Sequence, residues 1–74
     1  MPLNLAETGI TYKIVKVGGL DKNRKHLSDL GFEPGETIEV ISSRPGGCVV
    51  KVKGSSLAIG MEIAKKIIIA DISR

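Results

Sequence analysis

Residues 26–41 read HLSDLGFEPGETIEVI and residues 44–69 read RPGGCVVKVKGSSLAIGMEIAKKIII, and these two stretches decide the fold. In the first, a short helical segment stops at Gly31, and Pro34-Gly35 then provides a turn before a β-branched run. In the second, glycine-rich turns separate short apolar segments of strand length. This succession of helix, turns and short strands predicts a small closed β-barrel.

Five segments have the composition of β-strands. Thr11–Val17 places β-branched residues between lysines, and from Cys48 onward Cys48, Val50 and Val52 alternate with residues expected on the opposite face. The expected strands are residues 11–17, 36–42, 48–53, 56–59 and 66–72. Closure would remove edges that so apolar a chain could not safely expose. The predicted fold is therefore mainly β, an SH3-like barrel of five to six strands with one short α-helix inserted after the first strand.

The inserted helix is predicted over Lys22–Leu30. Asp21 is expected to cap its first turn, because a carboxylate there accepts from unpaired amides, and Gly31 is expected to end it in a left-handed conformation. The apolar side chains near one face are Leu20, Leu27 and Leu30. Two further single helical turns are expected, within Leu3–Thr8 and within Gly60–Ala64.

Length and composition limit the class of protein. The 74 residues allow one domain, 1–74, and an apolar fraction of 42% is enough for a packed core. The single Cys48 excludes an internal disulfide and favours a reducing compartment. No signal-peptide pattern is present near Met1, and the longest apolar stretch, Ile67–Ala70, is too short to span a bilayer. We therefore expect a cytoplasmic protein.

Catalytic and metal chemistry have few candidate residues. His26 and Cys48 could form a nucleophilic pair, but no third group is placed to orient them, so the protein is not expected to be an enzyme. The same two residues are the weak candidates for a metal site, and one histidine and one cysteine on different elements are a poor start. Because Cys48 alternates in phase with Val50 and Val52, it is interpreted as a core residue. No resident cofactor is expected.

Nucleic acid is a poor fit as a partner. Binders of single strands normally stack bases on aromatic side chains, and this chain has only Tyr12 and Phe32. Gly18-Gly19 precedes the predicted helix, but the phosphate-binding P-loop pattern is absent. Direct nucleic-acid binding is therefore not expected.

A protein-docking surface fits the charge pattern better. The chain has a net charge of +3, the predicted helix is basic from Lys22 to His26, and Arg44 lies on a predicted loop. An exposed arginine beside apolar residues is typical of an interface anchor. The side chains expected near a partner are Arg24, Lys25, Leu27, Phe32 and Arg44. An apolar surface left open by so small a barrel could equally form a homo-oligomer.

The chain resembles the FeoA family of bacterial ferrous iron uptake. The resemblance begins with LGFEPGETIEVI at residues 30–41 and continues through residues 44–69 quoted above. PLNLAETGITYKIVKVGG at residues 2–19 is similar to the opening strand of the family, and KNRKHLSDLGF at 22–32 to its basic helix. Cys48 stands where the family often has a polar residue, and Lys25-His26 where a second arginine is frequent.

The resemblance implies an accessory or regulatory role beside the FeoB-type membrane transporter, whose cytoplasmic region carries a GTP-binding domain. It implies docking by protein–protein contacts, no shared catalytic residues and at most weak binding of a transition metal such as iron. A contribution to GTP hydrolysis would need an arginine finger, for which Arg24 and Arg44 are available. A related module ends the diphtheria-toxin-repressor-type metal regulators. A regulator domain or a metal-sensing module is thus the alternative, although Met1 and the absence of a DNA-binding domain favour a stand-alone protein.

Overall fold

The computed structural model describes residues 1–19 and 21–72, and within the inserted helix it describes side chains from Arg24 onward. The elements in chain order are a 3₁₀ turn η1 (Leu3–Leu5), β1 (Thr11–Val17), α1 (Asp21–Asp29), β2 (Thr37–Arg44), β3 (Gly47–Val52), β4 (Ser55–Gly60), α2 (Met61–Ala64) and β5 (Ile67–Asp71). In the described chain no helix has the length and hydropathy needed to cross a bilayer.

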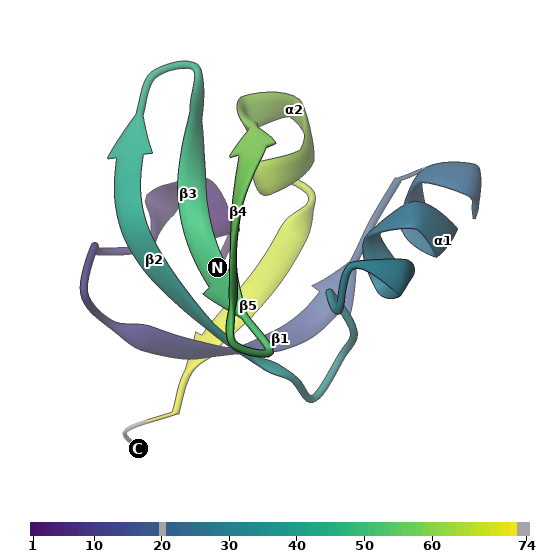
Figure 1. Ribbon diagram of the computed structural model, residues 1–74, viewed down its shortest axis with the longest axis horizontal. Coiled ribbons are helices and arrows are strands. Elements are labelled where there is room, and N and C mark those ends of the chain that lie inside the picture. The colour runs from purple at the N-terminus through teal and green to yellow at the C-terminus, as the bar shows by residue number, and fades with distance from the viewer. Residues whose placement is uncertain (20, 73–74) are drawn as a thin grey trace.

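The strands form one antiparallel sheet in the order β4-β3-β2-β1-β5, which curls around its core (Figure 1). The mainly β class, the strand number and the helix after the first strand are as predicted. The predicted closure of the barrel is not observed. Within residues 1–19 and 21–72, β4 and β5 are the two ends of the sheet, and no backbone ladder joins them. The four-residue helix α2 separates them in the chain and packs against β3 and β4, so the barrel stays open at this seam.

The β2–β3 hairpin is tighter than the sequence indicated. Arg44, expected on a loop, pairs with Gly47, so the connection is a two-residue turn and β2 extends two residues beyond its predicted end. A Cβ atom built at Gly47 would overlap the carbonyl oxygen of Ile59 on β4. Glycine is required here because β3 and β4 approach each other closely.

The end of α1 follows the prediction for Gly31. This residue has φ 104°, its N–H donates to the Ser28 carbonyl at 3.0 Å, and the Phe32 N–H donates to the Leu27 carbonyl at 2.9 Å. The two bonds form a Schellman motif, in which an apolar contact across the cap normally accompanies the hydrogen bonds. Accordingly, Leu27 and Phe32 are both core residues.

The start of α1 differs by one residue from the prediction. The helix begins at Asp21 rather than Lys22, and it ends before Leu30, which is 38% exposed instead of lying on the buried face. The expected contribution of Leu20 and the capping role of the Asp21 side chain fall outside the described part of the chain.

The core confirms the predicted strand phase. Its buried side chains are Leu3, Tyr12, Ile14, Leu27, Phe32, Ile38, Val40, Cys48, Val50, Val52, Ile59, Ala64, Ile67 and Ile69. Along β3, Cys48, Val50 and Val52 are buried, whereas Lys51 is exposed on the opposite face. Burial of this alternating set supplies most of the driving force for folding.

The outer edge of β5 is covered by the first residues of the chain. The Met1 amino group donates to the Ile69 carbonyl at 2.6 Å, and the Ile69 N–H donates to the Met1 carbonyl at 2.7 Å. Pro2 forms an antiparallel bridge with Ile68. One end of the sheet is thus capped by a short backbone pairing.

Candidate docking surfaces

A groove lies between α1, the end of β1 and the loop that follows α1. It encloses about 320 Å³ and is lined by Val15, Lys16, Val17, Arg24, Ser28, Phe32, Glu33 and Pro34. This surface, called the α1 groove below, combines apolar side chains with two cations and one carboxylate.

A β-bulge in β1 leaves two successive residues, Val15 and Lys16, exposed at this groove. The register with β5 shifts between Ile14, which pairs with Ile69, and Lys16, which pairs with Ile68. Val15 is the extra residue and its side chain is 52% exposed. Bulges often redirect a side chain next to a functional site.

Specific hydrogen bonds hold the walls of the α1 groove. The Ser28 hydroxyl donates to Glu33 Oε1 at 2.8 Å, which links the last turn of α1 to the following loop. The same loop is fastened to β1, because the Gly35 N–H donates to the Ile14 carbonyl and the Ile14 N–H donates to the Glu36 carbonyl, both at 2.8 Å. The groove is therefore formed before any partner arrives, which lowers the entropy cost of binding.

The rim of the α1 groove carries positively charged side chains. Arg24 and Lys16 are exposed, and the carboxylate of Glu33 already accepts from Ser28. Arginine combined with an aromatic floor and exposed aliphatic surface is the composition of protein-interface anchors. The arrangement fits an apolar side chain flanked by an acidic group.

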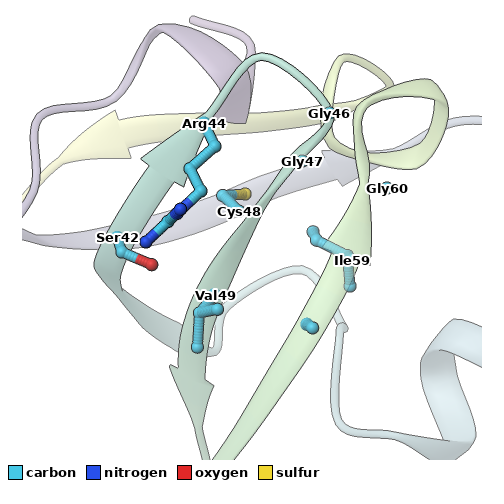
Figure 2. A pocket seen from close by; sticks show the side chains of 9 residues that line it. Ser42, Arg44, Gly46, Gly47, Cys48, Val49, Ile59 and Gly60 are labelled. Atoms are coloured by element: carbon cyan, nitrogen blue, oxygen red, sulfur yellow. The ribbon is translucent and has the colours of Figure 1, made fainter.

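A second hollow lies at the tip of the β2–β3 hairpin, on the side of β4 (Figure 2). It encloses about 450 Å³ and is lined by Ser42, Arg44, Gly46, Gly47, Cys48, Val49, Ala58, Ile59 and Gly60. Figure 2 shows the Arg44 side chain running toward Ser42 rather than across the hollow. Three glycines contribute backbone alone, so the space exists mainly because side chains are missing. This surface is called the hairpin hollow below.

Cys48 is buried as predicted, and its surroundings make it unreactive. The side chain is 5% exposed, and burial raises the pKa of the Cys48 thiol by disfavouring the thiolate. The thiol therefore stays protonated at neutral pH, whereas both nucleophilic attack and metal binding require the thiolate.

The weak metal candidates are not part of a ligand cluster. His26 is exposed in the last turn of α1, and Cys48 is buried in β3. Among the side chains that the structure describes, no group of three or more His, Cys, Asp or Glu residues converges to hold a metal ion.

The five side chains expected near a partner do not share one surface. Arg24 lies at the α1 groove, and Lys25 is exposed on α1 without lining either hollow. Arg44 lies at the hairpin hollow, which shares no residue with the α1 groove and stands at a different side of the molecule (Figure 1). Arg24 and Arg44 therefore do not lie together in one compact interface.

Leu27 and Phe32 require a correction. They are 2% and 1% exposed, so neither side chain offers appreciable surface to a partner while the protein is folded. They are buried because the Schellman cap turns both toward the core. Phe32 still lies under the α1 groove and shapes it.

Val15 was not identified from the sequence as a residue of a docking surface, although the alternation along β1 contains a signal for it. Strict alternation after Tyr12 and Ile14 would turn Lys16 inward, where a lysine is costly. The same alternation turns Val15 outward, and a bulge resolves the conflict at Lys16 by turning this residue outward as well.

An open five-stranded antiparallel sheet with one inserted helix places the protein in the SH3-like class of small β domains. The model of the FeoA domain matches residues 1–71, and the chain belongs to the FeoA family. This family is one of ferrous iron transport accessory proteins, and the resemblance noted in the sequence is confirmed.

Similar proteins agree with the assignment. The chain is 30% identical to the Fe(2+) transport protein A of Methanocaldococcus jannaschii over 70 residues, which are 95% of this chain and 85% of that protein. A crystal structure of an iron uptake regulatory protein, FeoA, superposes with a TM-score of 0.87 at 31% identity and covers 95% of both chains. The FeoA of Stenotrophomonas maltophilia in complex with zinc, described as an SH3 domain protein, gives a TM-score of 0.80 at 23% identity, over 93% of this chain and 88% of that one.

The same fold occurs within larger regulators. A manganese-dependent transcriptional repressor superposes with a TM-score of 0.87 at 16% identity, and the match covers 97% of this chain but 41% of the repressor. At that identity the likeness concerns the fold alone.

Proposed function

We propose that the protein is a cytoplasmic accessory component of ferrous iron uptake that docks through the α1 groove on the cytoplasmic region of a FeoB-type transporter. The observation that carries the proposal is a preformed, cationic, partly apolar groove in a chain whose FeoA match spans residues 1–71. Docking requires complementary surface and no bond-making chemistry.

The groove supplies the parts that such contacts need. Val15 provides exposed aliphatic surface, Arg24 provides a planar cation, and the Ser28–Glu33 bond links α1 to the loop that forms another part of the groove. Interfaces derive most of their free energy from a few anchors in rigid, apolar surroundings. Arg24 and Val15 are the residues proposed to contact the transporter, whereas Lys25 is exposed on α1 outside the groove.

The proposed action is contact and not catalysis or metal transfer. The buried Cys48 thiol stays protonated, and His26 is exposed without a clustered ligand among the described side chains. The protein would therefore change the behaviour of the transporter by binding to one of its conformations more tightly than to another.

Titration calorimetry against the cytoplasmic region of the matching transporter tests the proposal. The titration is run with and without a GTP analogue and with and without Fe(II) under anaerobic conditions. Saturable binding is expected, with Arg24→Glu weakening it. Arg44→Glu makes the same charge change at the hairpin hollow, which shares no residue with the α1 groove, and serves as the matched control.

Three outcomes separate the proposal from its alternatives. No binding in any nucleotide or metal state would refute docking on this region. Equal weakening by Arg24→Glu and Arg44→Glu would mean that net charge and not the groove drives association. Uptake of Fe(II) by the isolated protein at micromolar metal would favour the metal-sensing alternative.

A further inference from the structure

The two end strands of the sheet, β4 and β5, differ in the backbone pairing of their outer edges. The outer edge of β5 is paired with Met1 and Pro2 through the backbone bonds described above. The other end strand, β4, makes its ladder with β3, and within the described residues its positions 55–59 make no backbone hydrogen bond to any other segment. One edge is capped and the other is left open.

The direction of the free backbone groups on β4 follows from the hairpin. The turn at Lys53-Gly54 has two residues, so Val52 and Ser55 exchange both hydrogen bonds, and the pairs then alternate along the ladder. Leu57 and Ile59 consequently bond to β3. The N–H and C=O groups of Ser56 and Ala58 point to the open edge.

The sequence of β4 lacks the features that usually protect an edge strand. Natural sheets guard their edges with charged residues, proline, bulges or a covering segment. Residues 55–60 read SSLAIG and contain no charge and no proline, and their ladder with β3 has no register shift. Ser56, Ala58 and Gly60 are also exposed. This edge is suited to accept another strand.

The side chains around the edge define the occupant. On the core side, Leu57 is half-buried at the margin of the core, so an apolar residue opposite it would extend the core. On the solvent side, Lys51 pairs with the small Ser56, leaving room for a long acidic side chain to reach over Ser56 toward the ammonium group. The net charge of +3 likewise favours a negatively charged partner.

A second copy of the chain fits the open edge of β4 less well than an acidic segment of a different protein. A six-residue strand is about 20 Å long and a sheet is about 10 Å thick, so edge-to-edge contact buries about 400 Å² over both copies. Stable specific interfaces bury about 1,200–2,000 Å². Two copies would also bring like net charges together.

From these observations we propose that the outer edge of β4 accepts an extended antiparallel segment of a partner protein whose residues alternate between apolar and acidic. The apolar residues would face Leu57, and the acidic residues would face Ser56 and Ala58. Backbone hydrogen bonds would supply affinity, and the alternating side chains would supply selectivity. This inference goes beyond the proposed function, since β4 shares no residue with the α1 groove.

The test uses the full chain and a capped nine-residue peptide in which valine alternates with glutamate. Amide shifts are expected to change along residues 55–60. In hydrogen exchange, the Ser56 and Ala58 amides are expected to be fast in the free protein and at least about tenfold slower with saturating peptide, because their N–H groups become bonded. Leu57 and Ile59 are expected to be protected in both states. A peptide with lysine in place of glutamate should bind at least about fivefold more weakly.

Matched variants isolate the backbone contribution. Ala58→Pro removes an N–H that points away from β3, so the β3–β4 ladder is retained and peptide affinity should fall at least about tenfold. Ala58→Val keeps the N–H and should bind as the original chain does. The peptide N-methylated at each glutamate makes the same test on the unchanged protein, and it should not bind.

Specific results would overturn the inference. Shift changes confined to the α1 groove, or equal binding of the N-methylated peptide, would remove the strand-pairing mode. Protection of Ser56 and Ala58 that rises with protein concentration in the absence of peptide would identify a second copy as the occupant. Absence of any change at residues 55–60 up to millimolar peptide would also refute it.

Discussion

The α1 groove and the hairpin hollow each contain one arginine and a comparable volume, yet they are built in opposite ways. The groove is formed by positioned side chains, with Val15 and Lys16 both exposed at a bulge and Ser28 bonded to Glu33. The hollow is formed by missing side chains, because Gly47 must let the backbone of β3 approach Ile59 on β4. A depression made by absent side chains reflects a folding requirement, whereas one made by ordered side chains offers recognition.

The largest expected effect is on stability, at the floor of the groove. Phe32→Ala should lower the free energy of unfolding by about 3–5 kcal/mol, because it removes a large buried side chain and leaves a cavity. Val15→Ala, at the rim of the same groove, should cost less than about 1 kcal/mol because Val15 is half exposed. Urea unfolding measures both. Equal losses would mean that the rim is structural, and the contrast with the hollow would fail.

The second prediction concerns the floor of the hairpin hollow. Gly47→Ala should lower the free energy of unfolding by about 1–3 kcal/mol, since the added methyl group overlaps backbone that cannot rotate away. Gly46→Ala is the matched control and should cost less than about 1 kcal/mol, because a Cβ atom there meets no atom within 4 Å. Thermal unfolding of the two variants measures the difference. If Gly47→Ala were as stable as Gly46→Ala, the hollow would not arise from close strand approach.

The third prediction separates the two arginines by binding. Arg24→Glu should weaken association with the cytoplasmic region of the transporter at least about tenfold, and Arg44→Glu less than about threefold. Calorimetry at one ionic strength compares them at equal net charge. A larger loss for Arg44→Glu would move the docking surface to the hairpin hollow.

The fourth prediction concerns Cys48 beneath the hairpin hollow. Burial raises the pKa of this thiol in the folded protein, so the fold favours the protonated form. The contribution of Cys48 to the free energy of unfolding is fully present below the ordinary thiol pKa, about 8.5. As pH rises above that value, the contribution falls by at most about 1.4 kcal/mol per pH unit.

A pH series of urea unfolding curves checks this effect. Cys48→Ala should lack this part of the decline between about pH 8.5 and 10, because it has no thiol to ionise. Parallel curves for the two proteins would indicate that solvent in the hollow already hydrates the sulfur atom.

Local patterns in the sequence predicted much of the fold. The span of β1, the cap at Gly31 and the inward phase of Cys48 all depend on residues close together in the chain, and each was found where expected. Features that depend on distant segments were not predicted. Examples are the pairing of Met1 with Ile69 and the seam between β4 and β5.

The candidate site was predicted only in part, for the same reason. The basic helix drew attention to Arg24, which does line the α1 groove. Exposure could not be read from residue type, so Leu27 and Phe32 were expected at a surface from which the cap withdraws them. The separation of Arg24 from Arg44 depends on how the hairpin and α1 are arranged around the sheet (Figure 1).

The most direct test of the central claim is amide shift mapping of the isotopically labelled protein against the unlabelled cytoplasmic region of the FeoB-type transporter. We expect the shifted or broadened amides to include residues 15–17 and 24–34, around the α1 groove, and residues 44–47 at the hairpin tip to stay unchanged. Changes at residues 44–47, with the α1 groove unaffected, would contradict it.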